Sequence, residues 1–231
     1  MDYGQFCPVS KAAGILGEKW TLLIVRDLLS ADGRRFRDFE RGMPKISPTV
    51  LAKRLSELCE IGLIVRKRIP GRRGYEYFLT DAGRDLGPVI TQLGIWGMEW
   101  GRGRLSDYDL DVYVIMVAIE TRIDPKLLVG RETVLHFEFS DLDDASEWWL
   151  VVTSNGVDLC LEDPGKETDV YFISDLRTMT EVYLGDISIG QARRSGRLKV
   201  TGKSALVRDL KTWFRPSVYA GIKAKGHLRA D

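Results

Sequence analysis

The sequence predicts an α+β fold in two domains, and three observations carry this prediction. Residues 1–100 consist mainly of segments with helical periodicity, interrupted by one pair of β-rich runs within 63–79. Residues 110–214 combine helical segments with several β-rich runs separated by turn residues. The intervening segment 101–107 is Gly-rich and polar, which favours a domain boundary. A chain of 231 residues is long enough for two domains, placed at 1–104 and 105–231.

Three short helices open the first domain. The spacing of apolar residues predicts two of them at 8–16 and 19–29, and a third that starts near residue 35. Phe36 and Phe39 lie on one face of the third helix. A longer helix, predicted from residue 80 to about 100, has apolar side chains at helical spacing along most of its length. So much apolar surface on one helix is more than a monomer of this size can cover.

A fourth helix follows Ser47, whose hydroxyl can cap it, and Pro48 suits its first turn. Its predicted buried stripe is Leu51, Leu55 and Leu58, which are spaced four and three residues apart. Gly62 ends the helix. The opposite side is polar and carries Thr49 and Lys53, with Arg54 on the flank.

A basic hairpin follows this helix at once. Runs 63–69 and 75–79 are β-rich, and the Pro/Gly-containing segment 70–74 joins them. The stretch 66–73 has no carboxylate and carries five cations: Arg66, Lys67, Arg68, Arg72 and Arg73. A helix that fits a DNA major groove, followed by a basic hairpin, is the outline of a winged helix-turn-helix.

The second domain begins with a predicted helix at 110–123. Four β-rich runs follow, at 133–139, 148–153, 157–161 and 169–173. Helices are predicted at 176–184 and 188–194, a last strand at 197–200 and a closing helix at 205–214. This order is mixed, with no sustained repeat.

Charge is distributed unevenly between the two halves. The formal net charge of the chain is +1, but residues 1–104 carry +6 and residues 105–231 carry −5. A basic module joined to an acidic one indicates separate partners for each.

Composition excludes several classes of protein and site. Three widely separated cysteines and two histidines give neither a disulfide framework nor metal-like spacing, so we expect no metal and no cofactor. No nucleophile–base set, Walker loop or dinucleotide fingerprint is present, so no enzymatic reaction is indicated. No apolar run is long enough to cross a bilayer and no secretion signal opens the chain, so we expect a cytoplasmic protein without membrane contact.

The first hundred residues resemble the HxlR-type branch of the MarR-like bacterial transcription regulators. The resemblance rests on motifs in the family's order, at 7–9, 16–24, 35–39, 46–51, 62–64, 75–77 and 79–83. It implies a winged-helix homodimer that binds a pseudo-palindromic double-stranded DNA operator. The helix after Ser47 would enter the major groove, and the hairpin would contact the flanking backbone or minor groove.

The second half is similar to the sterol-carrier-protein-2 (SCP2) fold, chiefly through residues 168–172, 188–192 and the stretch 195–202, which reads SGRLKVTG. This similarity implies a five-stranded sheet with helices around an apolar cavity for a hydrophobic effector. Candidate cavity residues are Trp149, Phe172, Met179, Tyr183, Leu184 and Trp213. Aromatic and Met stripes of this kind are also typical of plain core, so that alternative stays open.

The DNA contacts that follow from a docked helix and wing are Ser47, Thr49, Val50, Lys53, Arg54, Arg68, Arg72 and Arg73. Cys7 precedes Pro8 at a predicted helix start, where the helix dipole can lower the pKa of its thiol and make it a redox sensor. The alternative is a small, half-buried apolar residue at a dimer interface.

The sequence therefore predicts a homodimeric, sequence-specific transcription regulator with an effector-binding second domain. Two alternatives remain. In one, the chain is a lipid or acyl carrier whose first domain serves only for dimerisation. In the other, the second domain binds no ligand and enlarges the dimer interface. The cationic wing separates the first alternative from the regulator, because a carrier has no use for it.

Overall fold

The computed structural model describes residues 3–31, 33–71, 73–101, 110–128 and 132–226. The chain divides into two compact units, residues 1–94 and 95–231. This division lies inside a helix rather than in the Gly-rich segment 101–107, most of which is outside the described residues. The reason is that the C-terminal segment holds residues near 99 in the second unit. The backbone N–H groups of Lys225 and Gly226 both donate to the Glu99 carbonyl, at 2.8 and 3.3 Å.

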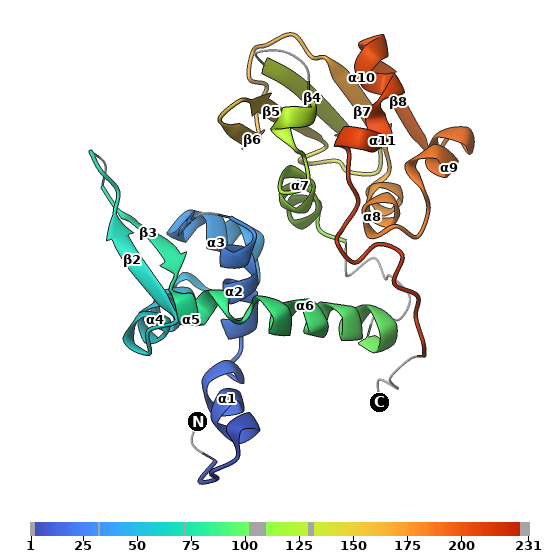
Figure 1. Ribbon diagram of the computed structural model, residues 1–231. Helices are drawn as coiled ribbons and strands as arrows, with labels where there is room; N and C mark the ends of the chain where they lie inside the picture. The colour runs from blue at the N-terminus through green and yellow to red at the C-terminus, as the bar shows by residue number, and fades with distance from the viewer. Residues whose placement is uncertain (1–2, 32, 72, 102–109, 129–131, 227–231) are drawn as a thin grey trace. The chain divides into compact units, whose positions relative to one another are not determined.

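The first unit has the element order of a winged helix (Figure 1). Its elements are α1 (Pro8–Leu16), α2 (Thr21–Leu29), β1 (Arg34–Arg35), α3 (Phe36–Gly42), α4 (Pro48–Glu60), β2 (Ile64–Arg68), β3 (Tyr75–Leu79), α5 (Asp81–Arg84) and α6 (Gly87–Trp96). Strands β1, β3 and β2 form an antiparallel sheet in that order. The winged helix-turn-helix prediction is confirmed, and β1 is an element that the sequence did not predict.

The core of the first unit is built where α2, α3 and α4 meet the sheet. The apolar stripe predicted on α4 is buried, with Leu51, Leu55 and Leu58 at most 1% exposed. It packs with Ile24, Val25, Leu28, Phe39, Met43, Ile46, Ile64 and Leu79. By contrast, α1 buries no residue. The stripe therefore fixes which face of α4 points to solvent.

The predicted long helix at 80–100 is wrong as a single element. Thr80 caps α5, where its Oγ1 accepts from the Gly83 N–H at 3.2 Å. The chain then breaks and resumes as α6, which continues into a π-helical turn, η1 (Gly97–Gly101). Pro88 accounts for the break, because it lacks an N–H and its ring would meet the carbonyl of residue 84 in a continuous helix.

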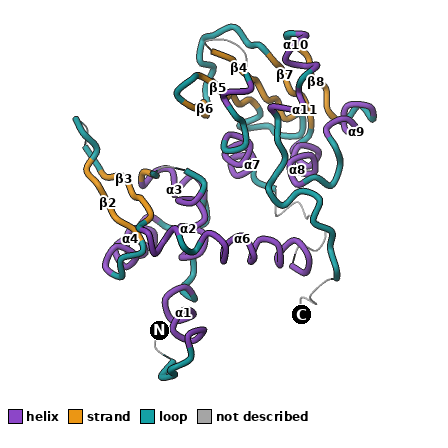
Figure 2. The backbone as a smooth tube through the Cα atoms, viewed as in Figure 1, coloured by secondary structure: helices purple, strands orange, loops and turns teal. Residues whose placement is uncertain are grey.

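The second unit is a five-stranded sheet with helices, as Figure 2 shows by its orange strands and purple helices. Its elements are α7 (Val112–Glu120), the 3₁₀ turn η3 (Pro125–Leu127), β4 (Glu132–Phe139), β5 (Glu147–Thr153), β6 (Gly156–Cys160), β7 (Val170–Ser174), α8 (Leu176–Leu184), α9 (Ile189–Arg194), β8 (Leu198–Gly202), α10 (Ser204–Arg208) and α11 (Leu210–Trp213). The strand order is β6-β5-β4-β7-β8, with only β4 and β7 parallel. All five predicted strands are present. The predicted closing helix is two short helices that meet at Asp209.

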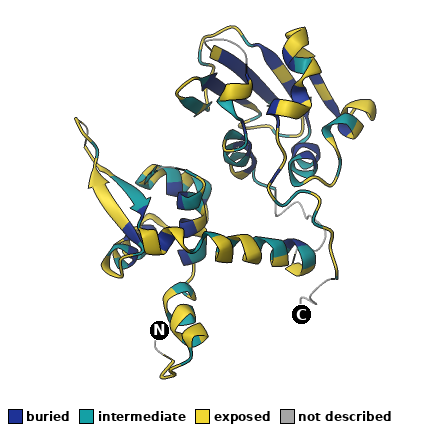
Figure 3. Cartoon of the chain, in the orientation of Figure 1, coloured by how far each residue is buried: buried dark blue, intermediate teal, exposed yellow. Residues whose placement is uncertain are grey.

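One face of this sheet carries the core of the second unit. Alternate residues of the central strands, such as Leu135, Phe137 and Phe172, pack against α7, α8 and α11. Figure 3 shows the sheet interior as buried. The opposite face carries a row of rings across three strands. His136 stacks on Trp149 with centroids 4.7 Å apart, and Tyr171 meets His136 edge-on at 5.6 Å.

Candidate nucleic-acid interface and ligand cavity

The N-terminal end of α4 is built as the sequence predicts. The Ser47 hydroxyl accepts a hydrogen bond from the Val50 N–H at 3.3 Å, and Pro48 occupies the first turn. Because Leu51 and Leu55 are buried, the side chains of Thr49, Val50 and Lys53 are exposed, Val50 to 42%. The Lys53 side chain is 75% exposed, with a loose 3.9 Å ion pair to Glu57. This end of α4 presents free polar, apolar and cationic groups to solvent.

Arg54 does not belong to this exposed set. Its side chain is only 15% exposed, and its guanidinium pairs with Glu57 at 2.6 Å and with Glu18 at 3.1 Å. Position 54 lies next to the buried Leu55, so the side chain runs along the unit's surface toward the segment before α2. Both terminal nitrogens of the guanidinium are therefore paired with carboxylates, Nη1 with Glu57 and Nη2 with Glu18. The geometry gives Arg54 a tethering role between α4 and residue 18.

The wing is a regular antiparallel hairpin in which Arg68 pairs with Tyr75. The last four residues of β2 are all exposed: Val65, Arg66, Lys67 and Arg68. Arg66 lies over the Tyr75 ring at 4.9 Å and Lys67 over the Phe78 ring at 4.8 Å, which holds both cations against the strand. Arg68 and Arg73 make no ion pair with any described residue and are exposed. Arg72 lies outside the described residues.

Sequence reasoning missed cations at the base of the sheet. Arg34 and Arg35 form β1 and pair with Tyr77 and Glu76 of β3. Arg35 and Arg37, the second residue of α3, are exposed, and Arg34 is partly exposed. A two-residue strand has no periodicity of its own, so only the run of basic residues before Phe36 could have signalled a surface here.

Comparisons with known proteins agree with this geometry. The model of the family HxlR-like helix-turn-helix matches residues 15–104. Among curated proteins, the uncharacterized HTH-type transcriptional regulator YvaP of Bacillus subtilis (strain 168) is 38% identical over 102 residues, which cover 43% of this chain and 94% of YvaP. The chain belongs to the HxlR-like helix-turn-helix family. Its helix-turn-helix unit is therefore of the kind found in transcription regulators.

Other relatives of this HxlR-like chain carry similar descriptions. The uncharacterized HTH-type transcriptional regulator YdeP, also of Bacillus subtilis (strain 168), is 38% identical over 103 residues, covering 43% of this chain and 77% of YdeP. A solved MarR-family regulator from Porphyromonas gingivalis W83 is 36% identical and has a TM-score of 0.39, covering 41% of this chain and 93% of that one. The SCP-2 sterol transfer family model matches residues 120–215. The HxlR-like module is thus fused to an SCP-2 domain.

The SCP-2 domain has a cavity of about 530 Å³ at the junction of α8, α9, α11 and the segment 216–221. Its apolar lining consists of Val182, Ile187, Ile189, Phe214, Pro216 and Ala220. Polar lining comes from Asp186, Ser188, Gln191 and Lys211. The volume is in the range of small-molecule sites.

The six predicted cavity residues do not gather around this space. Phe172, Met179 and Trp213 are each 1% exposed and belong to the packed core. Trp149 lies on the opposite face of the sheet, because side chains alternate along a strand and Trp148 is the core residue. Tyr183 and Leu184 are half-buried at the end of α8, next to the cavity-lining Val182. The alternative of plain core describes Phe172, Met179 and Trp213.

Cys7 precedes α1 without capping it through its side chain. The backbone N–H groups of Ser10 and Val9 point at its sulfur and lower the pKa of the thiol. Burial instead raises the pKa of Cys59 and of Cys160. All three cysteines are free. No group of metal-ligating side chains is found in the described part of the chain, and none of its helices has the length and apolarity of a membrane span.

Proposed function

We propose that this HxlR-like chain is a homodimeric, sequence-specific DNA-binding regulator whose SCP-2 domain binds a hydrophobic effector. The observation that carries the proposal is the pairing, on one small unit, of a capped helix with an exposed N-terminal end and a wing with unpaired arginines. In such a protein, the wing contacts the DNA phosphate backbone and thereby fixes the orientation of the protein. The helix contacts the base edges.

Each exposed residue of α4 has a role in this proposal. Thr49 and Val50 offer apolar contact to a thymine methyl group, and the Thr49 hydroxyl can bond a base edge. Lys53 contacts a phosphate or the acceptor atoms of guanine. Ser47, at the capped helix end, faces a phosphate, where the first backbone N–H groups and the helix dipole favour negative charge. Arg54 is left out because carboxylates occupy it.

The wing supplies the electrostatic part of binding. Arg68 and Arg73 are exposed, with no anionic partner among the described residues, and Arg72 directly precedes Arg73 in the sequence. Arginines in this position neutralise phosphates or enter a narrow minor groove. When these arginines neutralise phosphates, counterions are released from the DNA. We therefore expect the DNA affinity to depend strongly on salt concentration.

A second copy of the chain accounts for exposed apolar surface on two helical segments, α1 with the residues before it and α6 with η1. On α1 and the residues before it, Tyr3, Phe6, Val9 and Ile15 are 47–93% exposed. On α6 and η1, Val89, Leu93, Trp96 and Trp100 are 36–49% exposed. Helices with such faces are stable when they pack against a partner. We therefore assign both faces to the homodimer interface.

The cavity at α8, α9 and α11 is the proposed effector site. Its aliphatic and aromatic lining favours a hydrophobic small molecule, and its few polar groups can orient one. To regulate DNA binding, the effector must bind one dimer geometry more tightly than the other. The regulatory coupling is thus a difference between two affinities.

Selection of duplexes from a random-sequence DNA library tests the DNA-binding function directly. The wild-type dimer should enrich a pseudo-palindromic site. The double variant Arg68→Ala/Arg73→Ala should bind that site more weakly and with a lower salt slope. Removing two exposed lysines of the second unit, Lys126→Ala/Lys223→Ala, is the charge-matched control. No enrichment by the wild-type chain would refute the function.

A lipid or acyl carrier is the second candidate, favoured by the match to the SCP-2 sterol transfer family. Native mass spectrometry of the intact protein purified from cells distinguishes the candidates when combined with the selection. A bound amphiphile together with enrichment of a DNA site supports the effector-controlled regulator. A bound amphiphile without enrichment supports the carrier. Enrichment with no bound molecule supports an SCP-2 domain that only enlarges the dimer.

A further inference from the structure

Positive charge is concentrated in one segment of the otherwise acidic second half. Residues 190–211 carry seven cations and one carboxylate, Asp209, although residues 105–231 together have a net charge of −5. The seven are Arg193, Arg194, Arg197, Lys199, Lys203, Arg208 and Lys211, and all are exposed. A net charge of +6 in 22 residues equals that of the whole first half of the chain. Such a local field needs an anionic partner or costs folding stability through repulsion.

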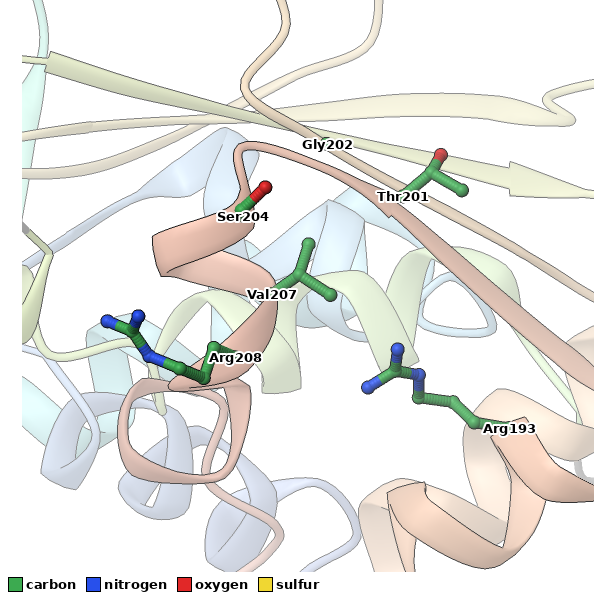
Figure 4. A pocket seen from close by; sticks show the side chains of 6 residues that line it. All are labelled: Arg193, Thr201, Gly202, Ser204, Val207 and Arg208. Atoms are coloured by element: carbon green, nitrogen blue, oxygen red, sulfur yellow. The ribbon is translucent and has the colours of Figure 1, made fainter.

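Two of these cations, Arg193 and Arg208, line an open cleft at the edge of the five-stranded sheet. The cleft, about 530 Å³ in volume, is lined by Arg193 of α9, Thr201 and Gly202 of the edge strand β8, and Ser204, Val207 and Arg208 of α10. Figure 4 shows Arg193 extending from α9 toward Val207, with Arg208 beyond Val207 and the two hydroxyl side chains above them. We call this surface the basic cleft.

Most of the charge is not neutralised within the chain. Arg197 pairs with Glu181 at 2.7 Å, Lys203 pairs with Asp169, and Arg208 pairs with Asp209 at 3.1 Å. The Arg208 pair is exposed, and exposed pairs of this kind are weak.

The other four cations, Arg193, Arg194, Lys199 and Lys211, make no ion pair with any residue that the structure describes. Two of them converge: the position of a Cβ on Gly190 would be 3.4 Å from Arg194 Nη1 and 3.9 Å from Lys211 Nζ. Both cationic groups therefore lie close to Gly190, where a bound anion would lower their mutual repulsion.

The exposure of the cleft indicates which anion. A buried pocket would desolvate one small anion, whereas exposed, long side chains on an open edge suit an extended polyanion whose counterions are released on binding. Hydroxyls such as those of Thr201 and Ser204 are also common phosphate donors.

A membrane is the less suitable polyanion. Surfaces that bind bilayers place large apolar side chains beside their cations. No large apolar side chain is exposed anywhere in 190–211, a stretch that the structure describes completely.

We propose that the basic cleft is a second DNA-backbone contact, which binds phosphates flanking the site read by α4 and the wing. This rests on the proposed DNA-binding function. Tethering to the winged helix keeps the SCP-2 domain at high local concentration near the DNA, so even a weak cleft contact adds to the affinity. The acidic remainder of the second half, with a net charge of −11, would orient the cleft toward the duplex.

The test compares salt slopes of the full-length dimer on two duplexes, the selected core alone and the same core with flanking DNA. The variant is Arg193→Gln/Arg208→Gln. The Lys126→Gln/Lys223→Gln variant is the matched control, since it removes the same charge from exposed positions outside the cleft. On the flanked duplex the cleft variant should lower the slope of log affinity against log salt by about 0.9 for each phosphate that it no longer binds. On the core duplex, wild type and variant should give the same slope.

The outcomes separate this proposal from the function on which it rests. If the wild-type chain selects no duplex, the DNA-binding function fails, and the cleft proposal fails with it. If it selects a site but the cleft variant and the control leave the slope on flanked DNA unchanged, only the cleft proposal is wrong. If the cleft variant instead loses binding to phosphatidylserine-containing vesicles while its DNA slope stays unchanged, the partner is a membrane and the proposal is again overturned. Equal melting temperatures of variant and wild type confirm that the exposed substitutions leave the fold intact.

Discussion

Two sets of side chains have the residue types expected of binding sites, one on α4 of the first unit and one among the aromatic residues of the second unit. The first set is exposed and the second is buried. On α4, Thr49, Val50 and Lys53 are exposed because the buried leucines point the other way. In the second unit, Phe172 and Trp213 are buried in contact with other rings. Residue type therefore indicates a binding site only after the burial of the same residue is known.

A core substitution gives the largest expected effect and tests the structural side of this comparison. Phe172 stacks on Phe137 at 4.5 Å and contacts Trp213 and Phe214. Phe172→Ala should destabilise the second unit by about 3–5 kcal/mol, because the cavity it leaves cannot be refilled. Urea unfolding followed by tryptophan fluorescence measures the change in the free energy of unfolding.

Its neighbour on the same strand is the matched control. Tyr171 lies on the opposite face of the sheet and is 40% exposed. Tyr171→Ala should cost about 1 kcal/mol or less, since its side chain is partly solvated and lies outside the packed core. Equal destabilisation by the two variants would contradict the assignment of Phe172 to a packed core, and a stable Phe172→Ala variant would restore it as a cavity residue.

The wing should show the reverse pattern, with a large effect on binding and none on stability. Arg68→Ala/Arg73→Ala removes two exposed arginines that have no anionic partner in the described part of the chain. The salt slope of DNA binding should fall by about 0.9 for each arginine that contacts a phosphate. Fluorescence anisotropy on the selected duplex across a salt series gives the slope. A lower affinity with an unchanged slope would mean that the arginines act by shaping the hairpin.

Elements that depend on contacts between residues near in sequence could be predicted, and contacts between residues far apart in sequence could not. The first four helices, the wing and all five SCP-2 strands could be predicted, because they depend on local periodicity, caps and turns. The α4 surface could also be predicted, since Leu51, Leu55 and Leu58 determine its orientation.

Tertiary partners could not be predicted in the same way. Arg54 is a residue type that often contacts DNA. Only its ion pair with Glu18, 36 residues earlier in the chain, shows that its side chain is held within the unit. Trp149 is a residue type that often lines cavities. Only the register of β4 and β5 shows that it lies on the face of the sheet opposite the core. Pro88 marks the break before α6, which the predicted continuous helix did not include, whereas no local signal marks the pairing of β1 with β3.

Two adjacent residues of α4 test this distinction on a single helix. Lys53→Ala should lower the salt slope by about 0.9 with no change in stability, because Lys53 is exposed and only loosely paired. Arg54→Ala should leave the slope unchanged and destabilise the first unit by about 1 kcal/mol, because it removes the ion pairs to Glu18 and Glu57 and leaves Glu57 only its loose pair with Lys53. Parallel thermal unfolding and anisotropy measurements separate the two. A fall in slope for Arg54→Ala would show that Arg54 exchanges its carboxylates for phosphate in the complex.

The smallest expected effect concerns the reactivity of Cys7. The N–H groups of Ser10 and Val9 lower the pKa of its thiol, whereas burial raises the pKa of Cys59 and Cys160. At neutral pH a larger fraction of Cys7 is therefore thiolate, and iodoacetamide should label it several-fold faster, as followed by peptide mass spectrometry. As pH rises, the Cys7 rate should level off first, because its thiol is already deprotonated while the other two are still titrating. Labelling of the unfolded chain is the control: the advantage should disappear there, since it depends on the start of α1. An advantage that survives unfolding would assign it to the local sequence and remove the structural basis for a redox-sensing role.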